Sequence, residues 1–168
     1  MDVLCGLILS KLREQVERTE HLLRLIPPEK IDWRPDWPGA RPLAELLGHL
    51  LDCLAGLCAV LYAAEPQKLA HFAAVRGRPV NQRCGVDEAR ERVQEYMRHI
   101  EEGFALLTDQ DLARRIPTVF VPEGEALLTL LLGNLEHLIN HKQQLFLYLK
   151  VLDVPVGTAD LYARRGVG

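Results

Sequence analysis

Two histidines near the end of the chain have the spacing of a metal-binding pair. His137 and His141 lie four residues apart in an apolar, strongly periodic segment. Four residues advance an α-helix by about 400°, so the two imidazoles are expected on one face, one turn apart. A single helix that supplies two ligands to one metal ion uses this arrangement. The pair is therefore the first candidate for chemistry in this sequence.

A third imidazole is available from another apolar segment. His49 is surrounded by leucines at positions 46, 47, 50 and 51. Two histidines from one helix and one from a neighbouring helix would give a site with three imidazole ligands. Burial of three imidazoles without partners would cost on the order of several kcal/mol, so a metal ion or hydrogen bonds must satisfy them.

The same residues also allow a purely structural interpretation. A single buried histidine is usually a hydrogen-bonded core residue, and a pair at this spacing arises readily by chance. Two observations favour the metal. The other histidines behave differently, because His21 and His99 fall on charged helix faces and His71 falls in a loop. No nucleophile-and-base constellation competes for the same residues. The pattern alone leaves both interpretations open.

Three neutral imidazoles would leave a divalent ion with its full charge and an open coordination position. A water or a thiol bound there would be acidified toward neutral pH and become a nucleophile. Glu45 lies one turn before His49 and is the candidate catalytic residue, either orienting an imidazole or handling a proton. The alternative for Glu45 is a first-turn carboxylate favoured by the helix dipole.

Other residues fall near the predicted site. Cys53 is either a thiolate ligand or, in better keeping with its apolar segment, an uncharged core thiol. Gly56 either leaves open volume beneath the metal or permits close helix packing. Asn134 and Tyr148 share the histidine face and are candidates for substrate contacts. Asn134 and Gln144 are candidates for side chains that orient a ligand.

Helical periodicity dominates the chain and predicts the elements that carry these residues. Proline pairs and single prolines mark the ends of the periodic segments. Each expected helix has roughly 20 or more residues, which corresponds to about 30 Å. The expected helices are Leu4–Ile26, Pro42–Glu65, Asp87–Leu107 and Glu125–Leu152.

Four such helices predict an all-α fold, a four-helix bundle that occupies residues 1–168 as a single domain. The connections between helices two and three and between helices three and four are long. About 20 residues reach roughly 65 Å when extended, which is enough to run the length of a bundle. An up-down-down-up order is therefore permitted. Thr118–Val121 is expected to be extended between two prolines, and Trp33 and Trp37 are expected to pin the first loop onto the bundle.

The connection between helices two and three, residues 66–86, has no acidic residue. If it folds over the end of the bundle, it could attract an anionic thiol or acid to the metal. A solvated loop is the alternative. Its basic residues are Lys68, Arg76, Arg78 and Arg83.

The composition is that of a globular protein, with 48% hydrophobic and 26% charged residues. A net charge of −3 and a pI near 6.1 argue against a nucleic-acid partner. Four cysteines are too few for a disulfide scaffold and predict reduced thiols in the cytoplasm. An acidic residue follows the initial methionine where a signal peptide carries basic ones. The apolar segment Leu43–Ala64 is interrupted by charged and histidine residues, which predicts a buried helix and no membrane partner.

Three segments resemble the DinB-like superfamily, which includes the YfiT-type proteins. They are Leu25–Pro35 (LIPPEKIDWRP), Leu43–Leu50 (LAELLGHL) and His137–Leu145 (HLINHKQQL), with a further likeness at Leu152–Pro155. The third segment is similar to the family signature H-x-x-x-H-[RK]-G-Q-[LI]. Two departures are Gln143, where the family commonly has glycine, and Ala40–Pro42, where the family commonly has serine or threonine. Both affect what is expected of a substrate pocket, and neither removes a ligand.

The resemblance implies an up-down-down-up bundle, often a homodimer, with His49, His137 and His141 as metal ligands. It also implies a metal-dependent enzyme that acts on a small-molecule substrate, of the type that transfers or isomerises low-molecular-weight thiols, or a hydrolase. The cofactor expected from imidazole ligands is a divalent transition metal ion, zinc or nickel foremost, with iron or manganese as alternatives. The competing hypothesis is a non-catalytic helical dimer or scaffold protein with a structural histidine site.

Overall fold

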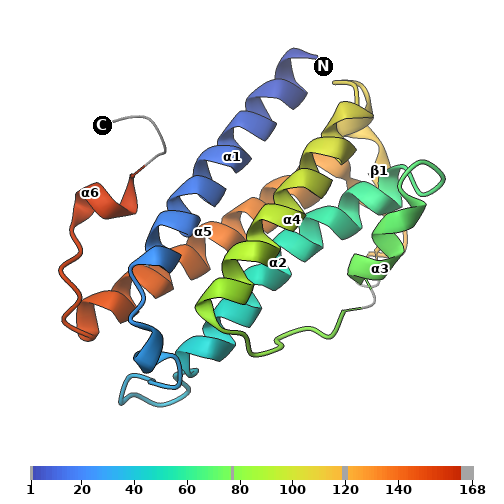
Figure 1. Cartoon of the computed structure of the whole chain (residues 1–168). Coiled ribbons are helices and arrows are strands. Elements are labelled where there is room, and N and C mark those ends of the chain that lie inside the picture. The colour runs from blue at the N-terminus through green and yellow to red at the C-terminus, as the bar shows by residue number, and fades with distance from the viewer. Residues whose placement is uncertain (1, 77, 119–120, 164–168) are drawn as a thin grey trace.

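Four long helices form the body of the computed structural model, which describes residues 2–76, 78–118 and 121–163. They lie side by side along a common direction (Figure 1). Their bounds are α1 Val3–Arg24, α2 Leu43–Ala64, α4 Val86–Ala105 and α5 Leu127–Val151. The four-helix bundle expected from the sequence is thus confirmed.

Prolines set several of the helix ends. α1 ends at Arg24, before Pro27, because a residue preceding proline is disfavoured in the helical region. Pro42 lies directly before α2, where its missing N–H costs no hydrogen bond, and its carbonyl accepts from the Leu46 N–H. Each of the expected ends of these two helices is correct to within two residues.

Helix directions follow from contacts between distant residues. Arg13 pairs with Glu101, and Gln94 donates to Glu20 about two turns further along α1, so α1 and α4 are antiparallel. The ammonium of Lys142 donates to Gln15 at 2.8 Å, between α1 and α5, which run in the same direction (Figure 1).

α2 packs against α4 and α5 on the other side of the bundle. α2 runs parallel to α4. The Cys58 thiol contacts the Tyr96 carbonyl, and Leu61, further along α2, contacts Gly103, further along α4. Gly56 contacts Asn134, and His49 contacts the histidines further along α5, so α2 and α5 are antiparallel. The order is up-down-down-up, as the long connections permitted.

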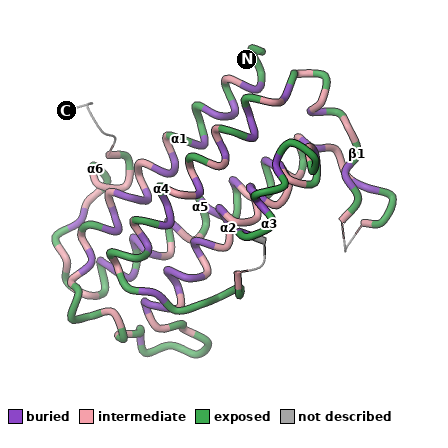
Figure 2. The backbone as a smooth tube through the Cα atoms, turned by 45° about the vertical axis from the view of Figure 1, so that its right-hand side comes forward, coloured by how far each residue is buried: buried purple, intermediate pink, exposed green. Residues whose placement is uncertain are grey.

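The core is built from aliphatic side chains of all four helices, and their inward faces are buried along their length (Figure 2). α2 is the most apolar helix. Its length and its mean hydropathy of 1.8 would suffice for a membrane span, but 56% of the window concerned is buried inside the bundle. These are the properties of a core helix.

The connections contain short elements that the periodicity did not predict. Residues 65–85 include the 3₁₀ turn η2 (Ala70–Phe72) and α3 (Ala73–Arg76). Residues 106–126 include η3 (Asp111–Ala113) and two short strands, β1 (Arg115–Ile116) and β2 (Glu125–Ala126). Two more single turns, η1 (Pro28–Lys30) and α6 (Thr158–Leu161), follow α1 and α5.

Helix four begins two residues later than expected. Helix four was expected from Glu125, but Glu125 and Ala126 pair with β1 in an antiparallel ladder, and α5 begins at Leu127. Gly124, with a φ of +86°, makes the turn that brings the two strands together. The expected extended segment Thr118–Val121 lies partly outside the described residues.

Candidate metal centre

The three histidines selected from the sequence meet between α2 and α5. The ring of His49 lies 5.2 Å from that of His137 and 4.3 Å from that of His141, and the latter two rings are 4.6 Å apart. One ring nitrogen from each residue lies within 4.8 Å of the others. His137 is exposed and the other two are half-buried, so the cluster opens to solvent on the His137 side.

The donor set fits a divalent transition metal ion. Nδ1 of His49 is buried and has no hydrogen-bond partner within the described part of the chain, so a water or a metal ion must satisfy this nitrogen. Desolvation, followed by the neighbouring histidines, lowers the pKa of His137 and His141 below 6.5. Both imidazoles are therefore neutral near pH 7, the state in which imidazole binds a metal.

A hydrogen-bonded chain orients one of the three rings. Nδ1 of His141 lies 3.0 Å from Oε1 of Gln144. When Nδ1 carries the ring proton and donates it to this oxygen, Nε2 is unprotonated and can bind a metal. The Gln144 amide in turn donates to the hydroxyl of Tyr148 at 3.5 Å, and this hydroxyl donates to the Arg41 carbonyl at 3.2 Å. The prediction that Gln144 orients a ligand is consistent with this geometry.

Two tryptophans hold Tyr148, near the end of this series of hydrogen bonds, in place. Trp33 and Trp37 each contact the Tyr148 ring edge to face, with ring centroids 5.7 Å apart. They thereby pin the loop between α1 and α2 onto α5, as the sequence predicted. Tyr148 is fully buried under them, so the prediction that it contacts a substrate is wrong.

Asn134 and Gly56 do not contribute open space beneath the histidines. A Cβ on Gly56 would overlap Oδ1 of Asn134, so this amide occupies the space that the glycine leaves. The Asn134 side chain also donates to the Leu130 carbonyl at 2.9 Å. Gly56 therefore permits close packing of α2 on α5, which was the second of the two interpretations, and Asn134 bonds its own helix rather than an imidazole.

Glu45 and Cys53 lie one turn either side of His49 and do not join the cluster. Glu45 is half-buried in the first turn of α2, and the described residues offer its carboxylate no hydrogen bond. The Cys53 thiol contacts the His49 carbonyl at 3.5 Å, and burial raises its pKa to about 12. It is therefore an uncharged core thiol, as the apolar segment favoured, and not a thiolate ligand.

Burial of the cysteines predicts a loss of stability at alkaline pH. Desolvation raises the pKa of Cys58 from 9.0 to about 12 and that of Cys84 from 9.0 to about 11. The folded state keeps these protons where the unfolded chain releases them. The stabilisation is complete below pH 9 and is lost as the pH rises toward 11 and 12. We expect each thiol to remove about 1.4 kcal/mol per pH unit from the free energy of unfolding above pH 9.

Urea unfolding at pH 7.5, 9 and 10 measures this loss. The free energy of unfolding of the double variant Cys58→Ala/Cys84→Ala should decline less steeply above pH 9 than that of the wild type. Lys142, whose pKa burial lowers to about 8, acts in the opposite direction but equally in both proteins. Parallel declines in the two proteins would contradict the assignment to the thiols.

Asp52 is a functional candidate that sequence reasoning missed. Its negative charge opposes the lowering of the His137 pKa that burial causes. Its carboxylate also accepts a hydrogen bond from the Asn81 N–H, and it lines a cavity of about 180 Å³ together with Gly56 and Tyr96. The signal was its position three residues after His49, which places both on one side of a helix.

The basic connection lies along α2 and not over the end of the bundle. The Cys84 N–H donates to the Ala44 carbonyl, and a Cβ on Gly48 would overlap the Gln82 carbonyl oxygen. Its described basic side chains are paired with carboxylates, which removes most of their attraction for an anion. The pairs are Lys68 with Glu65, Arg78 with Glu95, and Arg83 with Asp32, and the side chain of Arg76 lies outside the described residues.

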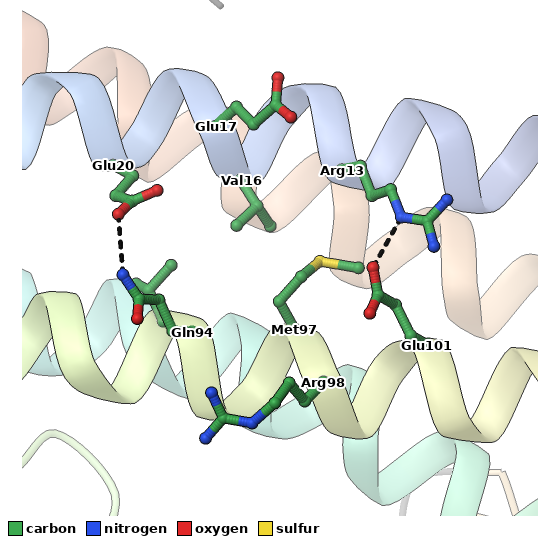
Figure 3. A pocket seen from close by; sticks show the side chains of 9 residues that line it. Arg13, Val16, Glu17, Glu20, Gln94, Met97, Arg98 and Glu101 are labelled. Carbon is green, nitrogen blue, oxygen red and sulfur yellow. Dashed lines mark hydrogen bonds and ion pairs between the residues drawn. The ribbon is translucent and has the colours of Figure 1, made fainter. Parts of the chain in front are cut away.

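A groove between α1 and α4 is separate from the histidines (Figure 3). It has a volume of about 450 Å³ and a floor that includes Val16 and Met97. Arg13 donates to Glu101 at 2.7 Å across it. This ion pair holds α1 against α4, and the described lining of the groove includes no histidine or cysteine.

Comparisons with known proteins agree with the fold. The crystal structure of a DinB-like protein (YjoA) from Bacillus subtilis matches with a TM-score of 0.67, at 18% identity, over 94% of this chain and 99% of that chain. At this identity the likeness shows the fold alone. The search of curated proteins found no match. A profile of the DinB superfamily matches residues 11–145, which include the three histidines and most of the bundle, and the chain therefore belongs to the DinB superfamily.

Proposed function

We propose that the chain is a divalent-metal-dependent enzyme of the thiol S-transferase, isomerase or hydrolase type. The observation that carries the proposal is the convergence of His49, His137 and His141 from two helices, with ligand nitrogens within 4.8 Å of one another. Three protein ligands leave a position for water or substrate, which distinguishes a catalytic site from a closed structural one.

A nitrogen-only donor set favours zinc or nickel, and iron or manganese follow as weaker candidates. When bound, the ion supplies a Lewis acid that lowers the pKa of a water or of a low-molecular-weight thiol. His49, His137 and His141 are the residues that would hold it.

Residues around the three histidines supply further polar groups to this site. Gln144 holds the ring of His141 in one tautomer through the 3.0 Å contact at Nδ1. Asp52, one turn after His49 on α2, carries a negative charge that acts on His137 and could attract a cationic group of a bound molecule. Glu45 remains the candidate for proton transfer on the other side of His49, with a carboxylate that the described residues leave unengaged.

The partner in this proposal is a small molecule, because an ion held by three protein ligands keeps a position for one. The described basic side chains of the connection are paired with carboxylates and offer little to a larger anionic partner. All four cysteines are free and buried, in keeping with a reducing compartment such as the cytoplasm.

Turnover of a thiol tests the proposal. We expect protein loaded with zinc or nickel to conjugate glutathione or cysteine to 1-chloro-2,4-dinitrobenzene, or to hydrolyse p-nitrophenyl acetate. His137→Ala should lower the rate about 100-fold or more, and EDTA treatment should have the same effect. His71→Ala, a histidine outside the cluster, is the matched control and should keep the wild-type rate.

Two results would contradict the proposal. Equal rates before and after chelation would exclude a metal-dependent reaction. A metal-loaded protein that turns over neither class of substrate, but whose melting temperature falls on chelation, would favour the structural site of a scaffold protein.

A further inference from the structure

A small cavity lies between α2, α4 and the connection that includes α3, and its described lining includes no histidine. Its volume of about 180 Å³ corresponds to roughly six molecules of liquid water. Small apolar side chains form much of its wall, and charged groups are added from both helices and from the connection. The lining residues that matter here are Ala55, Ala59, Val75 and Val80, with Asp52, Arg78, Arg92 and Tyr96.

The positive charge of Arg78 is already neutralised. Its guanidinium donates two hydrogen bonds to the carboxylate of Glu95, at 2.9 and 2.7 Å. Such a bidentate pair is among the strong charge-assisted contacts and carries no net charge. The charges that a ligand would meet in the cavity are therefore those of Arg92 on α4 and Asp52 on α2.

Arg92 is nine-tenths buried, and its hydrogen-bonding capacity is only partly used. One N–H of its guanidinium donates to the Tyr96 hydroxyl at 3.0 Å. Its ion pair with Glu88 is long, at 3.5 Å, and the Glu88 side chain is 51% exposed. The Nε atom of Arg92 is buried and has no hydrogen-bond partner among the described residues. A buried guanidinium with an unused donor requires an acceptor, which is either a water or an anionic group of a ligand.

Asp52 brings the opposite charge to the same cavity. Its Oδ2 accepts a hydrogen bond from the Asn81 N–H, and the described residues offer no hydrogen bond to its Oδ1. One carboxylate oxygen is therefore available to a donor in the cavity. An ammonium group is the donor that best matches a carboxylate in both charge and hydrogen bonding.

The two opposite charges lie at about the same level of the bundle without pairing with each other. The contact of Cys58 with Tyr96 gives the register of the parallel helices α2 and α4. Asp52, six residues before Cys58, is therefore level with about position 90 of α4, within one helical turn of Arg92. The ion pairs of the described residues do not include one between Asp52 and Arg92. This arrangement suits a ligand that carries both an ammonium and a carboxylate.

We propose that this cavity binds the ammonium and carboxylate groups of a small α-amino acid. Arg92 and the Tyr96 hydroxyl donate to the carboxylate, and Asp52 accepts from the ammonium. The two groups of an α-amino acid are joined to one carbon atom, which matches two charges at one level. The volume and the apolar wall admit a side chain of about one or two carbon atoms. The inference goes beyond the proposed function, because neither the cavity nor its charges involve the metal.

Matched probes test the proposal. L-2-Aminobutyrate carries both charges and no thiol, butyrate lacks its ammonium, and n-propylamine lacks its carboxylate. The full chain is freed of metal with EDTA, so that chelation of an ion by the amino acid cannot contribute. We expect L-2-aminobutyrate to bind with a dissociation constant of about 0.1–10 mM, and each single-charge probe to bind at least about tenfold more weakly.

Shifts of backbone amide NMR resonances measure this binding and show where it occurs. The amides of Ala55 and Asn81, beside the cavity, should shift with saturation as L-2-aminobutyrate is added. The amide of Gly133 on α5, where an added Cβ would meet no atom within 4 Å, should not shift. The dissociation constant is obtained from the saturating shifts.

Carboxylate-to-amide substitutions distinguish the cavity from the rest of the surface. Asp52→Asn removes the charge and keeps an oxygen that can accept from the Asn81 N–H. Its affinity for L-2-aminobutyrate should fall at least about tenfold, to that of butyrate. Arg92→Gln should lower the affinity to that of n-propylamine. Glu91→Gln, on the exposed face of α4, is the matched control and should keep the wild-type affinity. An unchanged circular dichroism spectrum shows that each variant is folded.

The proposal is overturned if butyrate binds as tightly as L-2-aminobutyrate, which would indicate a site for anions only. It is equally overturned if no probe gives saturable shifts up to about 50 mM, or if Asp52→Asn and Glu91→Gln bind the amino acid alike. These outcomes do not bear on the proposed function, because the experiment reads neither metal content nor turnover.

Discussion

Replacing His141 with alanine is expected to lower the affinity for zinc or nickel by at least about 100-fold. Loss of a residue that merely orients a ligand costs 10–100-fold in metal affinity, and loss of a ligand costs more. The wild type should bind about one ion per chain, because its three ring nitrogens lie within 4.8 Å of one another. Competition with a chromophoric chelator, together with elemental analysis of the purified protein, measures the change.

Two further variants distinguish the loss of a metal ligand from the loss of the residue that orients it. Gln144→Ala removes the partner of Nδ1 of His141 and should weaken binding by about 10–100-fold, less than the loss of the ring itself. His71→Ala should leave the metal affinity unchanged. Equal metal content in wild type and in His141→Ala would exclude the three-histidine centre.

Replacing Gly48 with alanine is expected to destabilise the fold by about 1–3 kcal/mol. A Cβ at this position would overlap the Gln82 carbonyl oxygen, a backbone atom that cannot rotate away. The connection that crosses α2 here must therefore shift, which disturbs the hydrogen bond from Asn81 to Asp52 beside the metal centre. Urea unfolding of the variant, with metal absent, measures the effect.

Gly133 in α5 is the matched control. A Cβ there would meet no atom within 4 Å. Because alanine favours a helix over glycine, Gly133→Ala should stabilise the protein by about 0.5–1 kcal/mol. The two substitutions should change the free energy of unfolding in opposite directions. This result would show that glycine is needed at position 48 because the Gln82 carbonyl approaches closely, and not because of helix propensity. A Gly48→Ala variant as stable as the wild type would contradict this reasoning.

The four long helices could be predicted from the sequence because their determinants are local, whereas the long connections only permitted the up-down-down-up order. Apolar periodicity identified all four long helices, and prolines placed the end of α1 and the start of α2 within two residues. The start of α5 was expected two residues early, because Glu125 and Ala126 belong to a strand pair whose partner strand is Arg115–Ile116. A two-residue strand has no periodicity of its own to detect.

The sequence predicted the three histidines of the metal centre but only some of the residues around them. His137 and His141 are neighbours on one helix by spacing alone, and His49 was the remaining histidine in an apolar helix. The contact of Gln144 with His141 spans three residues and could be inferred from α5 alone. Asp52 could not be assigned, because the effect of its charge on His137 depends on how α2 and α5 pack against each other.

What the sequence determined by itself is therefore the set of helices and the three imidazoles they carry, since helical spacing fixes which side chains share a face. Only the tertiary structure decided which of the neighbouring groups serve the site. Packing closed the space at Gly56 with Asn134, turned Cys53 into a buried thiol and paired the described basic residues of the connection with carboxylates. The physical reason is that burial and charge pairing depend on contacts between segments far apart in the chain, whereas periodicity depends on neighbours.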